Sequence, residues 1–306
     1  MKPVIAIVGP TGIGKSKLGL LLARTFNADI VNADSRQVYR YMDIGTAKPS
    51  PEEQRTVPHH LIDIINPDDN FSLALYQSLA YSSIKDIVQH DRLPLMVGGS
   101  GLYIWSVLEG WDIPKAPPNP NFRRQMEERA SVEGIEALYR QLQSIDPVTA
   151  MKTDPRNLRR VIRALEVYET TRKSPSELQG KRPPPFDILI IGLTTQRETL
   201  YKMIDRRVDD MIKQGLVEEV KGLLKRGYGF DLSAMSSVGY KEIGQVLRGE
   251  LDMLTAIQKI KFQTHRFARH QYAWFRLPDP RIHWFDIQDD LERNVLHFIR
   301  EKVTMP

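Results

Sequence analysis

A complete phosphate-binding loop lies near the start of the chain, in the run IVGPTGIGKSKL. Its pattern G-x-x-x-x-G-K-S covers residues 9–16, between an apolar run at 4–8 and a helical pattern. This is the setting in which the motif binds phosphate. Glycines let backbone N–H groups turn toward phosphate oxygens, and the helix start adds its positive dipole end. The expected phosphate contacts of this nucleotide-binding, typically ATP-binding, loop are Gly9, Pro10, Thr11, Gly12, Ile13, Gly14, Lys15 and Ser16.

Short β-rich runs alternate with helical stretches after the loop, which is typical of a parallel sheet with crossover helices. The expected strands are residues 4–8, 29–34, 93–99 and 187–195. The pattern of Leu200, Ile204, Val208 and Met211 predicts a helix after the last of them. The sequence therefore predicts an α/β fold with a P-loop-containing parallel sheet.

Two proline clusters, IPKAPPNPN and KRPPPFD, interrupt this alternation. Proline fixes φ and lacks an N–H, so neither cluster suits a helix interior or a central strand. The residues between them have helical patterning. We therefore predict a core of residues 1–113 and 186–306, the latter with C-terminal helices, and an inserted helical domain at 114–185. The alternative is a long excursion packed on the core.

Composition restricts the class of protein. The chain has 306 residues and no cysteine, which excludes disulfides and cysteine-bound zinc and fits a reducing cytoplasm. We see no signal peptide and no apolar run near the roughly 20 residues of a membrane helix, and we expect a cytoplasmic monomer. The net charge of +5 is a mild indication of a polyanionic partner.

The acid that a P-loop hydrolase needs is missing from the expected place. A hydrolase holds its metal with a carboxylate at the end of a second buried strand, whereas the apolar run LPLMVGGSG ends in Gly98, Gly99 and Ser100. The available acid is Asp34, in NADSRQVY. The carboxyl end of a parallel strand faces the ligand crevice, so Asp34 and Gln37 are expected to face a second substrate. The alternative is that Asp34 caps a helix.

Basic residues gather in two segments. In DPRNLRRVIRALEV, four arginines without acidic partners share one predicted helix face, which indicates contact with a nucleic-acid backbone; they are Arg156, Arg159, Arg160 and Arg163. The alternative is a solvated basic face. A second segment, residues 258–276, mixes arginines with aromatic side chains and suits stacked or single-stranded nucleic acid. Its predicted core side includes Phe267 and Trp274, and ordinary packing explains the aromatics equally well.

Two further features are weaker. His59 and His60 lack the partners of a metal site, and we interpret them as structural or substrate-lining. Arg206 and Arg207 either clamp a diphosphate opposite the loop or form a surface pair.

Seven segments, taken in order, resemble tRNA dimethylallyltransferases of the bacterial type, also called tRNA isopentenyltransferases. They are GPTGIGKS, NADSRQVYRYMDIGTAKP, PHHLIDI, VGGSGLY, NLRRVIRALEVY, SSVGYKEI and FARHQYAWFR. The resemblance covers about residues 4–276. It implies transfer of a dimethylallyl group from dimethylallyl diphosphate to N6 of the adenine 3′ of the anticodon, in tRNAs that read codons beginning with U. The loop would then hold the diphosphate as a leaving group.

The resemblance also implies residue roles. Asp34 would accept or orient the N6 proton; Thr11, Lys15 and Arg207 would act on the diphosphate, with Mg²⁺ on Ser16. The tRNA anticodon stem-loop would contact Asp34, Ser35, Arg36, Gln37, Ser100, Arg123, Arg159, Arg160, Val161, Ile162 and Arg163.

Three alternative functions remain open at this point. A P-loop small-molecule kinase is consistent with the loop and the sheet. An adenylate isopentenyltransferase acting on a free nucleotide would share the loop but have little use for the arginine stripe. An RNA-binding module with a vestigial loop is the non-enzymatic alternative.

Overall fold

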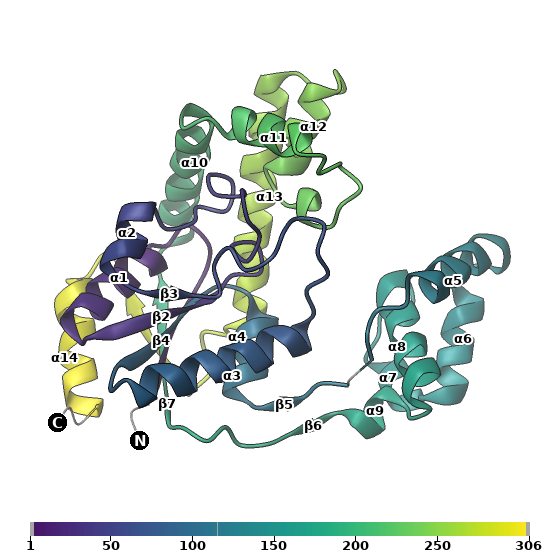
Figure 1. Ribbon diagram of the computed structural model, residues 1–306, viewed down its shortest axis with the longest axis horizontal. Coiled ribbons are helices and arrows are strands. Elements are labelled where there is room, and N and C mark those ends of the chain that lie inside the picture. Colours follow the sequence, from purple (N-terminus) through teal and green to yellow (C-terminus); the bar gives the residue numbers. More distant parts are fainter. Residues whose placement is uncertain (1–2, 115, 304–306) are drawn as a thin grey trace. The chain divides into compact units, whose positions relative to one another are not determined.

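The computed structural model describes residues 3–114 and 116–303. By their internal contacts these fall into two units, and most of their elements are labelled in Figure 1. The larger unit comprises the chain up to Phe71, then Tyr76–Leu108 and the chain from Pro185 onward. The smaller unit comprises Ser72–Leu75 and Glu109–Pro184.

A six-stranded parallel sheet forms the centre of the larger unit, in the order β3-β2-β4-β1-β7-β8. Its strands are β1 (Val4–Val8), β2 (Ala28–Ala33), β3 (His59–His60), β4 (Leu93–Gly98), β7 (Ile188–Thr194) and β8 (Ile282–Asp286). The predicted α/β class is therefore confirmed. Four strands match the apolar runs, while β3 and β8 were not predicted, because β3 has two residues and β8 is a mixed IHWFD segment.

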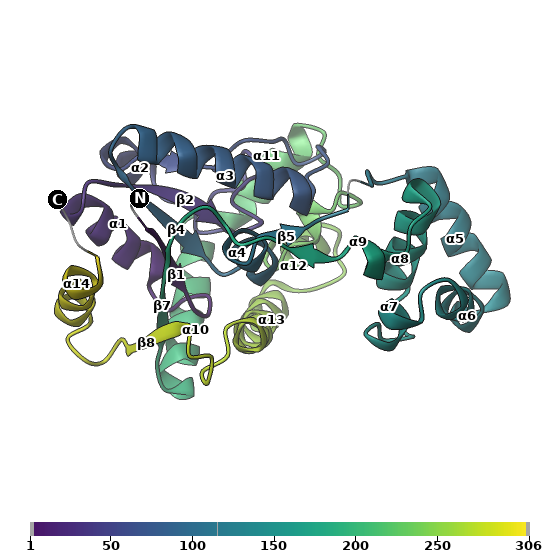
Figure 2. The ribbon, with the colours of Figure 1, turned by 90° about the horizontal axis from the view of Figure 1, so that it is seen from below.

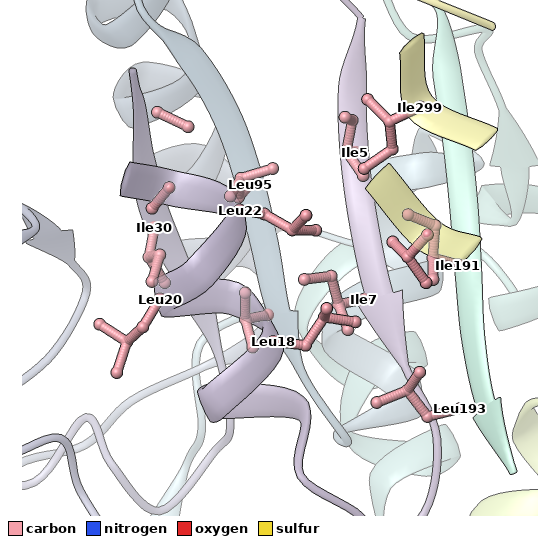
Figure 3. Packing of buried hydrophobic residues seen from close by; sticks show 14 of the residues in the cluster. Ile5, Ile7, Leu18, Leu20, Leu22, Ile30, Leu95, Ile191, Leu193 and Ile299 are labelled. Carbon is pink, nitrogen blue, oxygen red and sulfur yellow. The ribbon is translucent and has the colours of Figure 1, made fainter. Parts of the chain in front are cut away.

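Helices cover both faces of this sheet, so β1, β2 and β4 are buried throughout. β1 and β4 are continuous apolar runs, whereas β2 also buries Asp29 and Asn32. In Figure 2, α3 lies on one side of the strands and α10 and α14 lie on the other. Figure 3 shows Leu18 and Leu22 of α1, together with Ile299 of α14, among the isoleucines of β1 and β7. This core fixes the carboxyl edge of the sheet, where the phosphate loop begins.

The helices of the larger unit follow the chain around this sheet. They are α1 (Lys15–Thr25), α2 (Pro51–Thr56), α3 (Leu73–Gln89, of which the first three residues belong to the smaller unit), α4 (Gly101–Leu108), α10 (Arg197–Lys213), α11 (Leu216–Lys225), η1 (Ala234–Ser236), α12 (Tyr240–Leu247), α13 (Met253–Trp274) and α14 (Leu291–Lys302). The prediction for α10 is confirmed, since its four apolar residues at helical spacing are all buried. Among the described residues, no helix combines the length and apolarity that crossing a bilayer requires.

The smaller unit is helical and has a core of its own. Its elements are β5 (Trp111–Asp112), α5 (Pro120–Glu133), α6 (Ile135–Ile145), α7 (Pro147–Met151), α8 (Leu158–Thr171), α9 (Pro175–Leu178) and β6 (Gly180–Lys181). Leu138 and Leu142 of α6 pack with Leu165 of α8 in that core. The unit starts at Glu109 rather than at the predicted residue 114, because β5 pairs with β6 in an antiparallel ribbon ahead of the prolines.

Candidate active site

The phosphate loop connects β1 to α1 and depends on glycine at several points. Gly9, Gly12 and Gly14 have φ values of 138°, 82° and 100°, a region that L side chains rarely adopt. A Cβ on Gly9 would lie 2.6 Å from the Leu193 carbonyl oxygen of β7. Gly14 precedes α1 without any side-chain cap, so the first N–H groups of the helix are available to an anion.

Lys15 folds back over the loop. Its Nζ donates to the carbonyl oxygens of Gly9 at 2.9 Å and Pro10 at 2.8 Å. Burial and the positive charge of Arg207 lower the pKa of Lys15 to about 7, while Asp34 acts in the opposite direction. A bound diphosphate would raise the pKa of Lys15 again, because a nearby negative charge favours the ammonium form.

Arg207 comes from α10 and faces the loop from across the cavity. Its Nη1 donates to Thr11 Oγ1 at 3.3 Å. Burial lowers the pKa of Arg207 and the nearby Asp34 carboxylate raises it, which leaves the guanidinium charged at any physiological pH. Its neighbour Arg206 is exposed and does not line the cavity. Of the predicted arginine pair, only Arg207 lies at the loop.

Asp34 follows β2 and is held by a local turn. Its backbone N–H donates to Asn32 Oδ1 at 2.9 Å, and its own Oδ1 accepts the Arg36 N–H at 2.8 Å. The Asn32 amide in turn donates to the Leu61 carbonyl at 2.9 Å. No helix follows Asp34, so the alternative of a helix cap is wrong. The turn uses one carboxylate oxygen, and Asp34 lines the cavity.

A single cavity of about 640 Å³ brings these groups together. Thr11, Gly12, Gly14, Lys15 and Ser16 of the loop line it, and so do Asp34, Gln37 and Arg207. Its apolar lining includes Ile44, Ile62 and Met211. The cavity therefore combines an anion cradle, a carboxylate and an apolar wall.

Of the predicted loop contacts, Gly9, Pro10 and Ile13 do not line the cavity. The carbonyl oxygens of Gly9 and Pro10 accept hydrogen bonds from Lys15, and the side chain of Ile13 is buried in the core. Thr11 lines the cavity, but its backbone N–H is already donated to Gln271 Oε1 at 2.7 Å. The cradle that remains is the glycine turn and the start of α1.

Gln271 was not predicted as part of the site. It is 3% exposed on α13, and its Nε2 also donates to the Gly99 carbonyl at 2.9 Å. One side chain therefore ties the phosphate loop to the turn after β4. The sequence carried no signal for this role, because the burial of Gln271, which makes its amide need partners, is visible only in the structure.

The residues after Asp34 take different positions. Gln37 lines the cavity, while Ser35 and Arg36 do not. The Ser35 N–H donates to Ser100 Oγ at 2.9 Å, and Arg36 Nη1 donates to the Ser233 carbonyl at 3.1 Å. Ser100 therefore supports the turn that presents Asp34.

Mg²⁺ is consistent with the groups present. In phosphate sites this ion keeps several waters and takes one or two protein ligands beside the phosphate oxygens. The Ser16 hydroxyl lies at the start of α1 in the cavity. Within the part of the chain that the structure describes, no three acidic, histidine or cysteine side chains gather as a metal cage. Ser16 and the substrate would hold the ion.

The two histidines have structural partners. His60 Nε2 lies 3.0 Å from Asp29 Oδ2, and Arg92 pairs with the same carboxylate. His59 Nδ1 lies 2.7 Å from the Val57 carbonyl, and burial lowers the pKa of its imidazole. His59 also lines the cavity.

In the smaller unit, Arg123 and Arg163 share one buried carboxylate. Glu166 is 1% exposed; Arg123 grips it with two hydrogen bonds of 2.8 Å, and Arg163 Nη1 lies 2.7 Å away. These bonds keep the pKa of Glu166 below its usual value despite burial. The prediction that the arginine stripe lacks acidic partners is therefore wrong for Arg163.

The rest of the stripe also differs from the prediction. The helix begins at Leu158 with Asn157 as its cap, so Arg156 lies in the preceding turn, paired with Asp154. Val161 and Ile162 belong to the core of the smaller unit at 0% and 3% exposure, so their side chains cannot contact tRNA. Arg159 and Arg160 are exposed in the first turn of α8.

The aromatic segment on α13 faces differently from the prediction. Phe267 and Trp274 are partly exposed, at 47% and 36%, and the inward positions belong to Ala268, Gln271 and the neighbouring Phe275. The prediction of a core side was wrong for Phe267 and Trp274, whose inward places are taken by small or polar residues, and it was right for Ile260, which is buried.

The fold and the cavity define a P-loop α/β protein whose loop faces Asp34, in place of the acid that a hydrolase carries after its second buried strand. A family model described as IPP transferase matches residues 37–277. The chain belongs to the IPP transferase family, whose members are prenyl-transferring enzymes.

Relatives and solved structures agree with this family. A tRNA dimethylallyltransferase of Thermomicrobium roseum is 49% identical over 98% of this chain and 93% of its own. One of Roseiflexus castenholzii is 51% identical over 96% of each chain. The crystal structure of a tRNA isopentenylpyrophosphate transferase from Bacillus halodurans superposes with a TM-score of 0.72 at 38% identity, covering 99% of this chain and 96% of that one. A eukaryotic dimethylallyltransferase acting on tRNA gives 0.82 at 28% identity, covering 99% and 79%.

Proposed function

We propose that the chain transfers the dimethylallyl group of dimethylallyl diphosphate to N6 of the adenine 3′ of the anticodon, in tRNAs that read codons beginning with U. The observation that carries the proposal is the shared cavity, in which the phosphate loop, Arg207 and Asp34 surround one space. A diphosphate and a purine amine are the two groups that such a lining suits.

The loop would bind the leaving group. The free N–H groups at the start of α1 would take diphosphate oxygens. Lys15 would exchange its two carbonyl partners for the diphosphate, and Arg207 would meet it from α10. Mg²⁺ held by Ser16 would supply further positive charge. Together these cations stabilise the charge that develops as the C1–O bond of the donor breaks.

Asp34 would serve the other substrate. The target base must leave its stack to reach the cavity, at a cost of a few kcal/mol that an anticodon loop lowers. As the N6–C1 bond forms, the Asp34 carboxylate accepts one proton from N6 and diphosphate departs. The Asp34 carboxylate and the phosphate loop both belong to the larger unit of one chain. The proposed site therefore needs no residue from a second protein chain.

One experiment separates the open alternatives. Purified protein is incubated with Mg²⁺, dimethylallyl diphosphate and unmodified tRNA, and nucleosides are then analysed by mass spectrometry. Parallel reactions replace the tRNA with free AMP, ADP or ATP, or replace the donor with labelled ATP. We expect N6-isopentenyladenosine from tRNA. Faster prenylation of free AMP, ADP or ATP would identify an adenylate isopentenyltransferase, and label transfer from ATP alone would identify a kinase. RNA binding without any transfer would identify a binding module.

A further inference from the structure

The segment Asp43–Lys48 is an irregular loop that lines the cavity, and one distant carboxylate holds it. Glu219 of α11 accepts the backbone N–H groups of Asp43 at 2.9 Å, Ile44 at 2.7 Å and Gly45 at 3.1 Å. Three adjacent donors on one carboxylate fix the path of the loop, because each charge-assisted bond is stronger than a neutral one.

Tyr240 fixes the carboxylate in turn. Its hydroxyl donates to Glu219 Oε1 at 2.6 Å, and its side chain is fully buried. Burial and the Glu219 charge raise the pKa of Tyr240 well above its usual value, so the phenol remains a donor. A Cβ on Gly45 would overlap the Tyr240 ring, so this close approach requires glycine.

The held loop then determines how Gln37 is oriented. Gln37 Nε2 donates to the carbonyl oxygens of Thr46 and Ala47, at 3.1 Å each. Carbonyl oxygens only accept, so the amide nitrogen must face them and both of its hydrogens are used. Gln37 Oε1 has no donor among the described residues, and it is the polar atom that Gln37 has left to offer a ligand.

The cavity therefore offers two acceptors, the Asp34 carboxylate and Gln37 Oε1. An exocyclic amine carries two N–H donors and can donate one to each of these acceptors. A base with a carbonyl at that position has only an acceptor there and can form neither hydrogen bond. We infer that Glu219 is a positioning residue for base selection, acting through residues 43–47 on Gln37. This inference rests on the proposed function, because it assumes that a purine enters the cavity.

The test measures selectivity by binding, so that chemistry does not contribute. Dissociation constants are determined for an anticodon stem-loop with adenine or hypoxanthine at the target position, with Mg²⁺ and pyrophosphate present. In Glu219→Gln we expect the preference for adenine to fall about threefold to tenfold, the value of one hydrogen bond. The matched control is Glu218→Gln, because Glu218 is the adjacent, exposed residue and pairs with Lys221 at the surface; it should keep the parental preference.

A double-mutant cycle distinguishes positioning from general damage. If Glu219 acts through Gln37, then Glu219→Gln should cause little further loss of preference in a Gln37→Ala background. An unchanged preference in Glu219→Gln, or full additivity with Gln37→Ala, would overturn the inference. Should Glu219→Gln fail to fold, Tyr240→Phe removes the hydrogen bond that fixes the Glu219 carboxylate. The same two results, an unchanged preference or full additivity with Gln37→Ala, would then overturn the inference. A parent protein that prenylates no adenine would instead refute the proposed function.

Discussion

The two carboxylate oxygens of Asp34 have different roles, one in the local turn and one toward the substrate. Oδ1 accepts the Arg36 N–H and shapes the turn, which leaves the other oxygen to the substrate. The amide oxygen of an asparagine can also accept the Arg36 N–H, but an asparagine cannot take a proton from the substrate. This difference allows a test of chemistry that leaves the local backbone unchanged.

We expect Asp34→Asn and Asp34→Ala to lower the single-turnover rate by about 10²- to 10⁴-fold, which is the usual contribution of a general base. Asp34→Asn should bind the stem-loop within a few-fold of the parent, because the turn survives. Rates come from rapid-quench prenylation and affinities from fluorescence anisotropy. A rate for Asp34→Asn close to that of the parent would assign the proton to another acceptor.

Lys15 predicts a pH effect with a definite sign. Its pKa is about 7 in the free protein because burial and Arg207 disfavour the ammonium form. A bound diphosphate favours that form and raises the pKa, so at pH 8 the complex holds a proton that the free protein lacks. Dimethylallyl diphosphate should therefore bind with proton uptake at pH 8 and with little uptake at pH 6.

Calorimetry in buffers of different ionisation enthalpy measures this uptake directly. The control is Lys15→Arg, whose guanidinium stays charged and should abolish the proton uptake even where affinity falls. Equal uptake in parent and Lys15→Arg would show that another group takes the proton.

At the scale of elements, the first turn of α8 is the part of the arginine stripe that remains available to RNA. Arg163 is committed to Glu166 and to the Ala116 carbonyl, and Arg156 to Asp154. Replacing Arg163 by glutamate would place a second carboxylate against the buried Glu166 carboxylate. Any loss of RNA binding in that variant would therefore reflect damaged folding. Arg159 and Arg160 avoid this difficulty because they are exposed.

Replacing Arg159 and Arg160 by glutamine should weaken tRNA binding and reduce the slope of log K against log salt by about one unit per lost phosphate contact. Binding of dimethylallyl diphosphate should not change. The matched control replaces Arg172 and Lys173, two exposed cations at the far end of the same helix. An equal loss of tRNA affinity in both double variants would mean that the RNA responds to the overall charge of this unit rather than to specific contacts with the first turn of α8.

The sequence predicted those elements whose signals are local. The four main strands and α10 follow from apolar runs and helical spacing, and the phosphate loop from its own pattern. Contacts between remote segments left no such signal: Gln271 meets Thr11 across 260 positions, and Glu219 meets Asp43 across 176. The apparent freedom of Arg163 was wrong for a different reason, since its partner Glu166 lies only three positions further along the same helix.

At the scale of the whole molecule, charge and chemistry are divided between the units. The smaller unit has 14 lysines and arginines against 11 aspartates and glutamates, so it carries +3 of the chain's net +5. The loop, Asp34 and Arg207 all belong to the larger unit. Each unit also has its own hydrophobic core, which favours separate responses to separate ligands.

Hydrogen exchange read by mass spectrometry tests this division. A ligand that binds one folded region slows the local opening of that region. Pyrophosphate with Mg²⁺ should therefore slow exchange at residues 9–25, and peptides of α5, α6 and α8 should exchange as in the free protein. An anticodon stem-loop should slow exchange at the start of α8 as well as around residues 34–48. The Arg159→Gln, Arg160→Gln variant should lose the protection at α8 and keep the pyrophosphate effect. Pyrophosphate protection of α5–α8 equal to that of the loop would contradict the assignment of donor binding to the larger unit alone.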